Sequence, residues 1–106
     1  MPNFISVYMT ATSPAEAEKI AHALIGEKLA ACVNIFPGVR SVYRWEGKVR
    51  DETEVVLIAK SRLEQFENLK NLVKNLHSST CPCIVAMPIA TGHQPYLSWI
   101  VQETTR

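Results

Sequence analysis

The sequence of 106 residues has almost no net charge, because its 11 basic residues are balanced by 10 acidic ones. A surplus of basic residues draws proteins to nucleic acid and to anionic membranes, so we expect neither partner. No apolar run reaches the roughly 18 residues that a membrane-spanning helix needs. Residues 1–4 also lack the basic segment that opens a signal peptide, and we predict none.

Cysteine is scarce, and its three positions, Cys32, Cys81 and Cys83, make an odd number. A disulfide framework uses an even number of cysteines, and a bridge between residues only two positions apart is strained. We therefore expect free thiols and a reducing compartment, the cytoplasm. Cys32 begins an apolar segment and is expected in the core.

The motifs of familiar catalytic sites are also missing. The sequence has no Ser-His-Asp order, no His-Glu-x-x-His pattern and no phosphate-binding loop. His77 and Cys81 are close enough to imitate a base and a nucleophile, but no third group is placed to orient them. We predict that the protein is not an enzyme.

The sequence does contain strand and helix patterns that alternate within a single domain, residues 1–106. Its hydrophobic fraction of 47% is typical of a soluble globular protein. Short β-rich or apolar runs predict strands, and apolar residues at helical spacing predict helices. Strands are predicted at residues 4–9, 32–45, 53–59 and 84–89. The second of these strands bends at 37–38 and is followed by a turn at 46–47. Helices are predicted at residues 14–29, after the segment 61–64, and, as a short helix, from residue 94.

Two helix starts have the same form. Ser13-Pro14-Ala15-Glu16 combines an N-cap serine, a proline in the first turn and a glutamate that closes a capping box. Ser61-Arg62-Leu63-Glu64 predicts a second capping box, and a stripe of apolar residues follows it. The stripe consists of Leu63, Phe66, Leu69, Val73 and Leu76. The strand at 53–59 is almost continuously apolar, which predicts burial on both faces.

This order of elements predicts an α+β fold, a ferredoxin-like split β-α-β sandwich with an antiparallel sheet and a short C-terminal helix. Two helices would cover one face of the sheet and leave the other open. Because Tyr43 and Trp45 lie on a long hairpin with few charges, we expect another subunit to cover that face.

Three functions of this fold are excluded by local sequence. The loop at 10–13 has neither the arginine of an acylphosphatase nor the cysteines of a copper chaperone. The strand at 54–58 has no aromatic residue, which an RNA-recognition motif requires.

Most of the chain resembles the CutA divalent-ion-tolerance family. The resemblance rests on Glu27 through Asn34, Pro37-Gly38, Ser41 through Lys48, Glu54 through Lys60, and Pro88 through Trp99. It implies a homotrimer with the architecture of the PII signalling proteins, a link to the tolerance of divalent cations, and a copper-binding role. It also implies small-effector clefts between subunits.

The resemblance places the family's proposed copper ligands at Met9, His77 and Cys83, of which only the histidine is the family's residue type. The substitutes are nonetheless soft donors, which suit Cu(I) or a related heavy-metal ion. Cys81 and Cys83 share a strand face and could flank one ion. The alternatives are that Met9 and Cys83 pack in the core and that His77 ends its helix. No metal is expected to be required for folding.

A second candidate site is the cleft between subunits. The resemblance places Trp45, Lys60, Tyr96 and Trp99 there, and aromatic walls with one cation suit a small anionic effector. Alternatively, the two tryptophans fill the trimer interface. Glu54 and Lys60 face the same side of one strand, so an inter-strand ion pair is a further alternative to binding.

Overall fold

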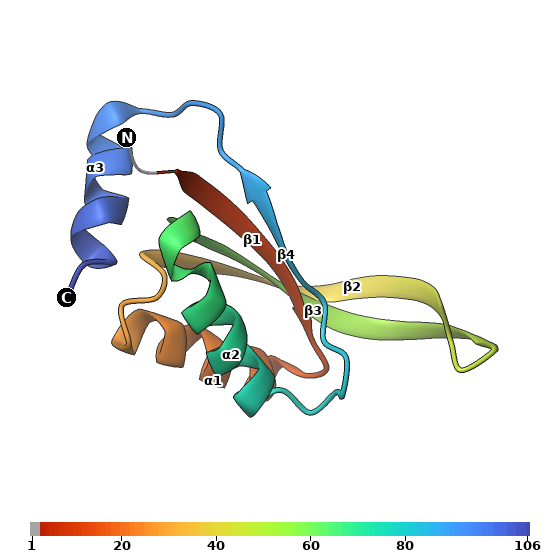
Figure 1. The fold of residues 1–106 in the computed structure, drawn as a ribbon. Helices are drawn as coiled ribbons and strands as arrows, with labels where there is room; N and C mark the ends of the chain where they lie inside the picture. Colours follow the sequence, from red (N-terminus) through yellow and green to blue (C-terminus); the bar gives the residue numbers. More distant parts are fainter. Residues whose placement is uncertain (1–2) are drawn as a thin grey trace.

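The computed structural model describes residues 3–106, and its centre is one antiparallel sheet of four strands. The strands are β1 (Phe4–Ala11), β2 (Cys32–Trp45), β3 (Lys48–Arg62) and β4 (Ile84–Pro88). Their order across the sheet is β2-β3-β1-β4, and all three neighbouring pairs are antiparallel. This order confirms the predicted α+β, ferredoxin-like split β-α-β sheet (Figure 1).

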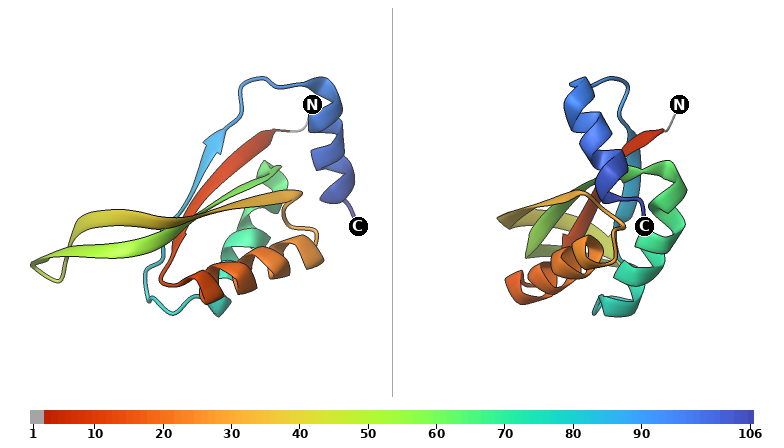
Figure 2. Two further views of the ribbon diagram at one scale, coloured as in Figure 1. Left: turned by 180° about the vertical axis from the view of Figure 1, so that it is seen from behind. Right: turned by 90° about the vertical axis from the view of Figure 1, so that its left-hand side faces the viewer.

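Two helices, α1 (Pro14–Gly26) and α2 (Phe66–Leu76), lie over the same face of the sheet (Figures 1 and 2). A single 3-10 turn, η1 (Leu63–Gln65), leads into α2. The predicted C-terminal helix is α3 (Gln94–Glu103), which lies apart from the other two and packs against β3. Within residues 3–106, no helix combines the length and the apolar character that spanning a membrane requires.

The alternation of β1 separates the two faces of the sheet. Ile5, Val7, Met9 and Ala11 are buried in the core that α1 and α2 cover. The residues between them, including Tyr8 and Thr10, are partly exposed and point to the opposite face. We call this second face, which α1 and α2 do not cover, the open face.

Only half of the first predicted capping box forms, because the carboxylate of Glu16 accepts from the N–H of Thr12 and not from that of Ser13. The Ser13 hydroxyl accepts a hydrogen bond from the backbone N–H of Glu16 at 3.1 Å, and Pro14 is the first residue of α1. The helix ends at Gly26, three residues earlier than predicted. Lys28 adopts a left-handed conformation with φ of 56°, and the N–H of Leu29 donates back to Leu24 at 2.9 Å, which closes the helix.

The second predicted capping box is wrong. Ser61 belongs to β3, and its hydroxyl donates to the carbonyl of Leu29 at 2.6 Å instead of capping a helix. The carboxylate of Glu64 pairs with the guanidinium of Arg62. Leu63 is exposed because it lies in η1, before the apolar stripe of α2 begins. The remaining stripe faces the core, with Leu69 and Val73 fully buried.

The hairpin of β2 and β3 extends well beyond the body of the molecule (Figure 1). The predicted bend is present as a register shift between Phe36 and Val39. The predicted turn is also present, with positive φ at Glu46 and Gly47. Within the predicted strand at 53–59, residues 55–57 and Ala59 are buried, whereas Thr53 is exposed and Glu54 and Ile58 are partly exposed. The strand β3 also begins five residues earlier than predicted, on the exposed projecting part.

Candidate functional site

A hollow of about 680 Å³ lies on the open face, between the projecting hairpin and the segment that joins α2 to β4. Strand β1 contributes Tyr8 and Thr10 to it. The hairpin contributes aromatic and charged residues, and the segment before β4 contributes an imidazole and thiols. The main chemical groups among its lining residues come from Tyr43, Trp45, Glu54, His77, Cys81 and Cys83.

The two thiols of this hollow, Cys81 and Cys83, are free, as predicted, and both residues are exposed, contrary to the alternative that Cys83 packs in the core. Burial raises the pKa of the Cys83 thiol above its usual value, and the negative charge of Glu54 raises it further. The Cys83 thiol is therefore protonated at neutral pH, and a metal ion would have to displace that proton. Sequence reasoning missed Glu54 as a neighbour of Cys83, because the two are 29 positions apart and meet only across the sheet.

His77 lies where it was predicted, at the C-terminal end of α2, and its side chain is only 4% exposed. Its Nδ1 atom accepts a hydrogen bond from the N–H of Ser79 at 2.9 Å. The proton therefore resides on Nε2, which donates to the carbonyl of Thr10 at 2.7 Å. Both ring nitrogens are engaged, so a metal ion at Nδ1 would have to replace the bond to Ser79.

Met9 does not lie with the other predicted ligands. Its side chain is 1% exposed and packs in the core on the face covered by the helices. Cys83 and His77 line the hollow on the other side of the sheet. Because successive residues of a strand point to opposite faces, β1 carries Met9 away from this hollow and presents Tyr8 and Thr10 to it.

The hollow lacks a complete ligand cluster. Across residues 3–106, no three histidine, cysteine, aspartate or glutamate side chains are grouped closely enough to hold a metal ion. The two thiols and the imidazole are still the donor types that fit a soft ion. A site with three or more ligands would require a rearrangement or a second chain.

Three residues of the second predicted site lie together near α3. The rings of Tyr96 and Trp99 are 5.5 Å apart and tilted by 40°. Lys60 pairs with Cys32 across β2 and β3, and burial and the neighbouring Cys32 raise the pKa of Tyr96. Cys32 is partly exposed, whereas it was predicted in the core. It lies between Lys60, its partner on the neighbouring strand, and the ring of Tyr96.

The alternative of an inter-strand ion pair at Glu54 and Lys60 is not realised among the described residues, since neither side chain forms a salt bridge there. The ammonium of Lys60 instead donates to the side-chain oxygen of Asn34 at 3.4 Å. The cation is thus held beside Cys32 and the aromatic rings, and Asn34 is a neighbour of Lys60 that the sequence analysis missed.

Trp45 does not join this group within one chain. It pairs with Lys48 at the turn of the hairpin, whereas Lys60 lies near the other end of β3. The side chain of Trp45 is exposed and lines the hollow that contains Cys81 and Cys83. A cleft that unites Trp45 with Lys60 would therefore need the hairpin of a second copy.

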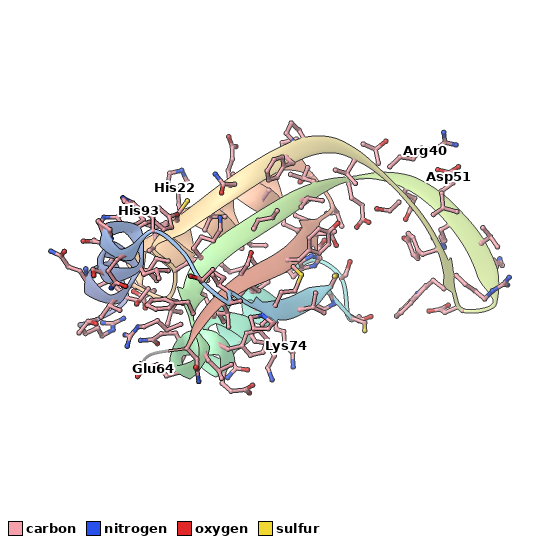
Figure 3. All side chains as sticks on the ribbon, turned by 90° about the horizontal axis from the view of Figure 1, so that it is seen from above. His22, Arg40, Asp51, Glu64, Lys74 and His93 are labelled. Atoms are coloured by element: carbon pink, nitrogen blue, oxygen red, sulfur yellow. The ribbon has the colours of Figure 1, made fainter. Side chains whose placement is uncertain are left out.

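The hairpin is stiffened by polar pairs on both of its faces. Arg40 and Asp51 lie side by side on one face, with Nε and Oδ1 2.7 Å apart (Figure 3). The bond to Arg40 lowers the pKa of the Asp51 carboxyl. On the other face, the Tyr43 hydroxyl donates to Glu52, which raises the pKa of Tyr43. These pairs hold an extended ribbon that the body of the molecule does not support.

A second hollow, of about 560 Å³, lies near the C-terminus beside Arg62 and Thr104. Its basic groups have acidic neighbours: Lys28 lies 3.9 Å from Glu103, and Arg106 lies 3.7 Å from Glu27. This internal pairing leaves little unbalanced charge to attract a ligand, so the hollow is not a candidate site.

Comparison with protein families places these features in context. The family model described as "CutA1 divalent ion tolerance protein" matches residues 5–103. A curated relative named "Divalent-cation tolerance protein CutA" from Archaeoglobus fulgidus is 51% identical over 100 residues, which cover 94% of this chain and 95% of the relative. A relative of the same name from Thermus thermophilus is 48% identical over 98 residues, covering 92% of this chain and 95% of the relative.

Solved structures give the same result. The divalent cation tolerance protein Cut A1 from Thermus thermophilus superposes with a TM-score of 0.94 at 46% identity, covering 96% of this chain and 99% of that one. CutA1 from Oryza sativa superposes with a TM-score of 0.95 at 41% identity, covering 98% and 95%. The similarity extends over almost the whole length of both chains.

Proposed function

Because the chain belongs to the CutA1 divalent ion tolerance family, we propose that it acts in divalent-ion tolerance as a homotrimer that binds copper or a related soft metal ion at Cys81 and Cys83. The observation that carries this proposal is the placement of both free thiols on one hollow of the open face, beside His77. The proposal involves no catalysed reaction.

The donor chemistry favours a soft ion. Thiolates select Cu(I) and similar ions over hard ions such as Mg²⁺ and Ca²⁺, which prefer oxygen ligands. Two thiolates are enough to hold Cu(I), and His77 is available as a third donor if the ion replaces its bond to Ser79. Because the Cys83 proton must leave, binding should weaken as the pH falls.

The exposed apolar surface supports the homotrimer. A two-stranded hairpin is only marginally stable by itself, and this one exposes Val42, Tyr43, Trp45 and Val49 along its projecting part. Further copies that cover the open face would bury Tyr43 and Trp45, whereas Val42 and Val49 lie on the opposite face of the ribbon and would be buried only by a copy that also packs there. They would also enclose the thiols and bring additional donors to an incomplete ligand set.

Free thiols also bear on the compartment. Exposed cysteines remain reduced in the cytoplasm, which we propose as the location. The names of relatives include a chloroplastic protein from Arabidopsis thaliana and a periplasmic one from Archaeoglobus fulgidus. The cytoplasmic location therefore rests on the thiols of this chain and not on the family.

A Cu(I) titration of the reduced protein against a competing chelator tests the metal proposal. The double variant C81S/C83S should lose high-affinity binding, because hydroxyls are poor ligands for Cu(I). The matched control is C32S, which removes the remaining thiol at a site away from the hollow and should bind as the parent does. Equal binding by the parent and the double variant would reject these thiols as ligands.

A second function is favoured by the cluster at α3. We propose, as an alternative, a PII-like signalling or scaffold trimer that binds a small anionic effector between subunits. Lys60 supplies the cation, and the paired rings of Tyr96 and Trp99 supply an aromatic wall. Trp45 would come from the hairpin of a neighbouring copy.

A thermal-shift screen with nucleotides and organic anions tests the alternative, because a ligand specific to the folded protein raises its melting temperature. A bound anion should give a shift that is reduced in K60A. The control is K74A, which removes a lysine on the exposed side of α2 and should leave the shift unchanged. Absence of any shift at saturating concentrations would contradict the effector role.

A further inference from the structure

Arg62 is the most deeply buried residue among the described lysines and arginines, at 9% exposure. It is the last residue of β3, two positions after Lys60 and therefore on the same face of the strand. A guanidinium is always charged, so its burial is unfavourable unless its donors are fully paired. Its partners therefore indicate what it does.

Those partners lie mainly at the C-terminal end of α3. Nε of Arg62 donates to the hydroxyl of Thr104 at 2.8 Å, and Nη2 donates to the carbonyl of Thr104 at 2.8 Å and to the hydroxyl of Thr105 at 3.2 Å. The remaining arm pairs with Glu64. Gln65 adds a further bond to the Thr104 carbonyl at 2.8 Å.

This arrangement holds the end of a helix from outside. The last carbonyls of a helix have no partner within it, and Thr104 is the residue that ends α3. Thr104 is completely buried, and its hydroxyl accepts from Arg62 while donating to the carbonyl of Ile100 at 2.7 Å. The end of α3 is thus fixed to β3 by the planar guanidinium of Arg62 and by the hydroxyl of Thr104, which accepts one hydrogen bond and donates another.

The fixed end sets the position of the aromatic pair. Trp99 and Tyr96 precede Thr104 by five and eight residues, which is about 8 and 12 Å along a helix. Lys60 is attached to the same strand as Arg62. A small tilt of α3 about its C-terminal end would therefore move both rings relative to the lysine.

We propose that Arg62 is a positioning residue for the cleft, and that its bonds to Thr104 and Thr105 fix where Tyr96 and Trp99 stand relative to Lys60. This role rests on the effector function proposed above, although the placement of α3 is measurable without any ligand. A lysine at this position keeps the charge but has no planar fork, so it does not reproduce both bonds to Thr104.

The test compares R62K and T104V with T104S. For fluorescence alone each variant also carries W45F, which leaves Trp99 as the sole tryptophan, and anion binding is measured with Trp45 present. T104V removes the hydroxyl with little change in side-chain volume, whereas T104S keeps a hydroxyl at this position. We expect R62K and T104V to shift the emission of Trp99 to longer wavelength and to increase its quenching by acrylamide. T104S should resemble the parent.

A second readout is the ultraviolet titration of Tyr96, obtained as the difference from Y96F variants. Burial and Cys32 raise the pKa of Tyr96 in the parent, so displacement of α3 should bring it back toward its ordinary value. If R62K or T104V lowers the melting temperature but leaves the signals of Trp99 and Tyr96 unchanged in the folded protein, Arg62 only stabilises the fold and the proposal is wrong.

The two proposals fail separately. A screen in which no anion shifts the melting temperature overturns the effector function, while a displaced α3 in R62K still establishes Arg62 as the residue that places the rings. Conversely, anion binding that R62K retains at parental strength, with unchanged Trp99 emission, overturns the role of Arg62 and leaves the cleft intact.

Discussion

Glu16 connects two loops that are far apart in the sequence. Its carboxylate accepts a hydrogen bond from the N–H of Thr12 at 2.8 Å and another from the N–H of Ser78, 62 positions away, at 2.7 Å. The side chain is 11% exposed. One residue therefore caps the start of α1 and anchors the segment that leads from His77 to the two thiols.

The first prediction concerns the replacement E16Q. Burial acts to raise the pKa of Glu16, but the hydrogen bonds from Thr12 and Ser78 dominate and lower it from 4.5 to about 2. The ionised form is thus favoured by folding, and its contribution is present above pH 4.5 and lost as the pH falls toward 2. An amide would turn a donor toward one of two backbone N–H groups, so we expect E16Q to lose about 2 kcal/mol at neutral pH.

Urea denaturation from pH 7 to pH 3 measures this effect. The difference between the parent and E16Q should shrink as the pH falls below 4.5. The matched control is E18Q on the exposed side of α1, which should change little at any pH. A constant difference across the range would show that the carboxylate charge is not the stabilising feature.

Residue-level prediction from sequence succeeded where the partner is local. Ser13 and Glu16 are three positions apart, so the hydrogen bond from the N–H of Glu16 to the Ser13 hydroxyl was predictable. The same spacing wrongly predicted a capping box at Ser61, because Ser61 is part of β3 and its hydroxyl donates to the carbonyl of Leu29. The contact of Glu16 with Ser78 depends on how two loops meet, which no local pattern reports.

At the scale of elements, the hairpin turn depends on backbone conformation. Glu46 and Gly47 have φ of 50° and 77°, the combination found in a two-residue type I′ turn. The right-handed twist of the paired strands matches this turn. Because Tyr43, Trp45 and the pairs on both ribbon faces lie next to it, the turn fixes the register of the whole projecting segment.

The second prediction is that G47A destabilises the protein by about 1 kcal/mol, because a side chain at positive φ is strained. No atom lies within 4 Å of the Cβ that the substitution adds, so the effect is conformational and not a clash. The control G26A also adds a Cβ in open space, but at a helical position, and should be neutral or slightly stabilising. Urea denaturation of both variants at one protein concentration distinguishes them, and equal effects would contradict this explanation.

Most strands and helices followed from periodicity, whereas their ends and orientations did not. The bend at residues 37–38 and the turn at 46–47 were predictable because proline and glycine mark them directly. The placement of Met9 was also within reach, since it alternates with Ile5 and Val7 and must share their face. The curvature that brings Trp45 over the hollow depends on the twist of the whole ribbon, and sequence pattern does not encode it locally.

For the whole molecule, the two candidate sites share one feature, which is that each is incomplete in a single chain. The hollow with Cys81 and Cys83 lacks a third grouped ligand among the described residues, and the cluster around Lys60 lacks Trp45. A projecting hairpin that reaches a neighbouring copy would bring Trp45 to the cluster around Lys60 and further ligands to the hollow. Assembly is therefore required for the effector function, and it would add donors to the two thiolates that can hold Cu(I) in one chain.

The third prediction is that the protein is a trimer, with three times the 11.9 kDa mass of one chain, whose melting temperature rises with protein concentration. W45A should weaken this assembly, because aromatic side chains at the centre of an interface contribute most to its stability. The matched control is I25A, which removes an apolar side chain of similar exposure from α1, on the covered side of the sheet. Light scattering over a dilution series should show dissociation of W45A at concentrations where the parent and I25A remain assembled. A parent protein that is monomeric at every concentration would contradict the assembly, and the two proposed sites would then have to be completed within one chain.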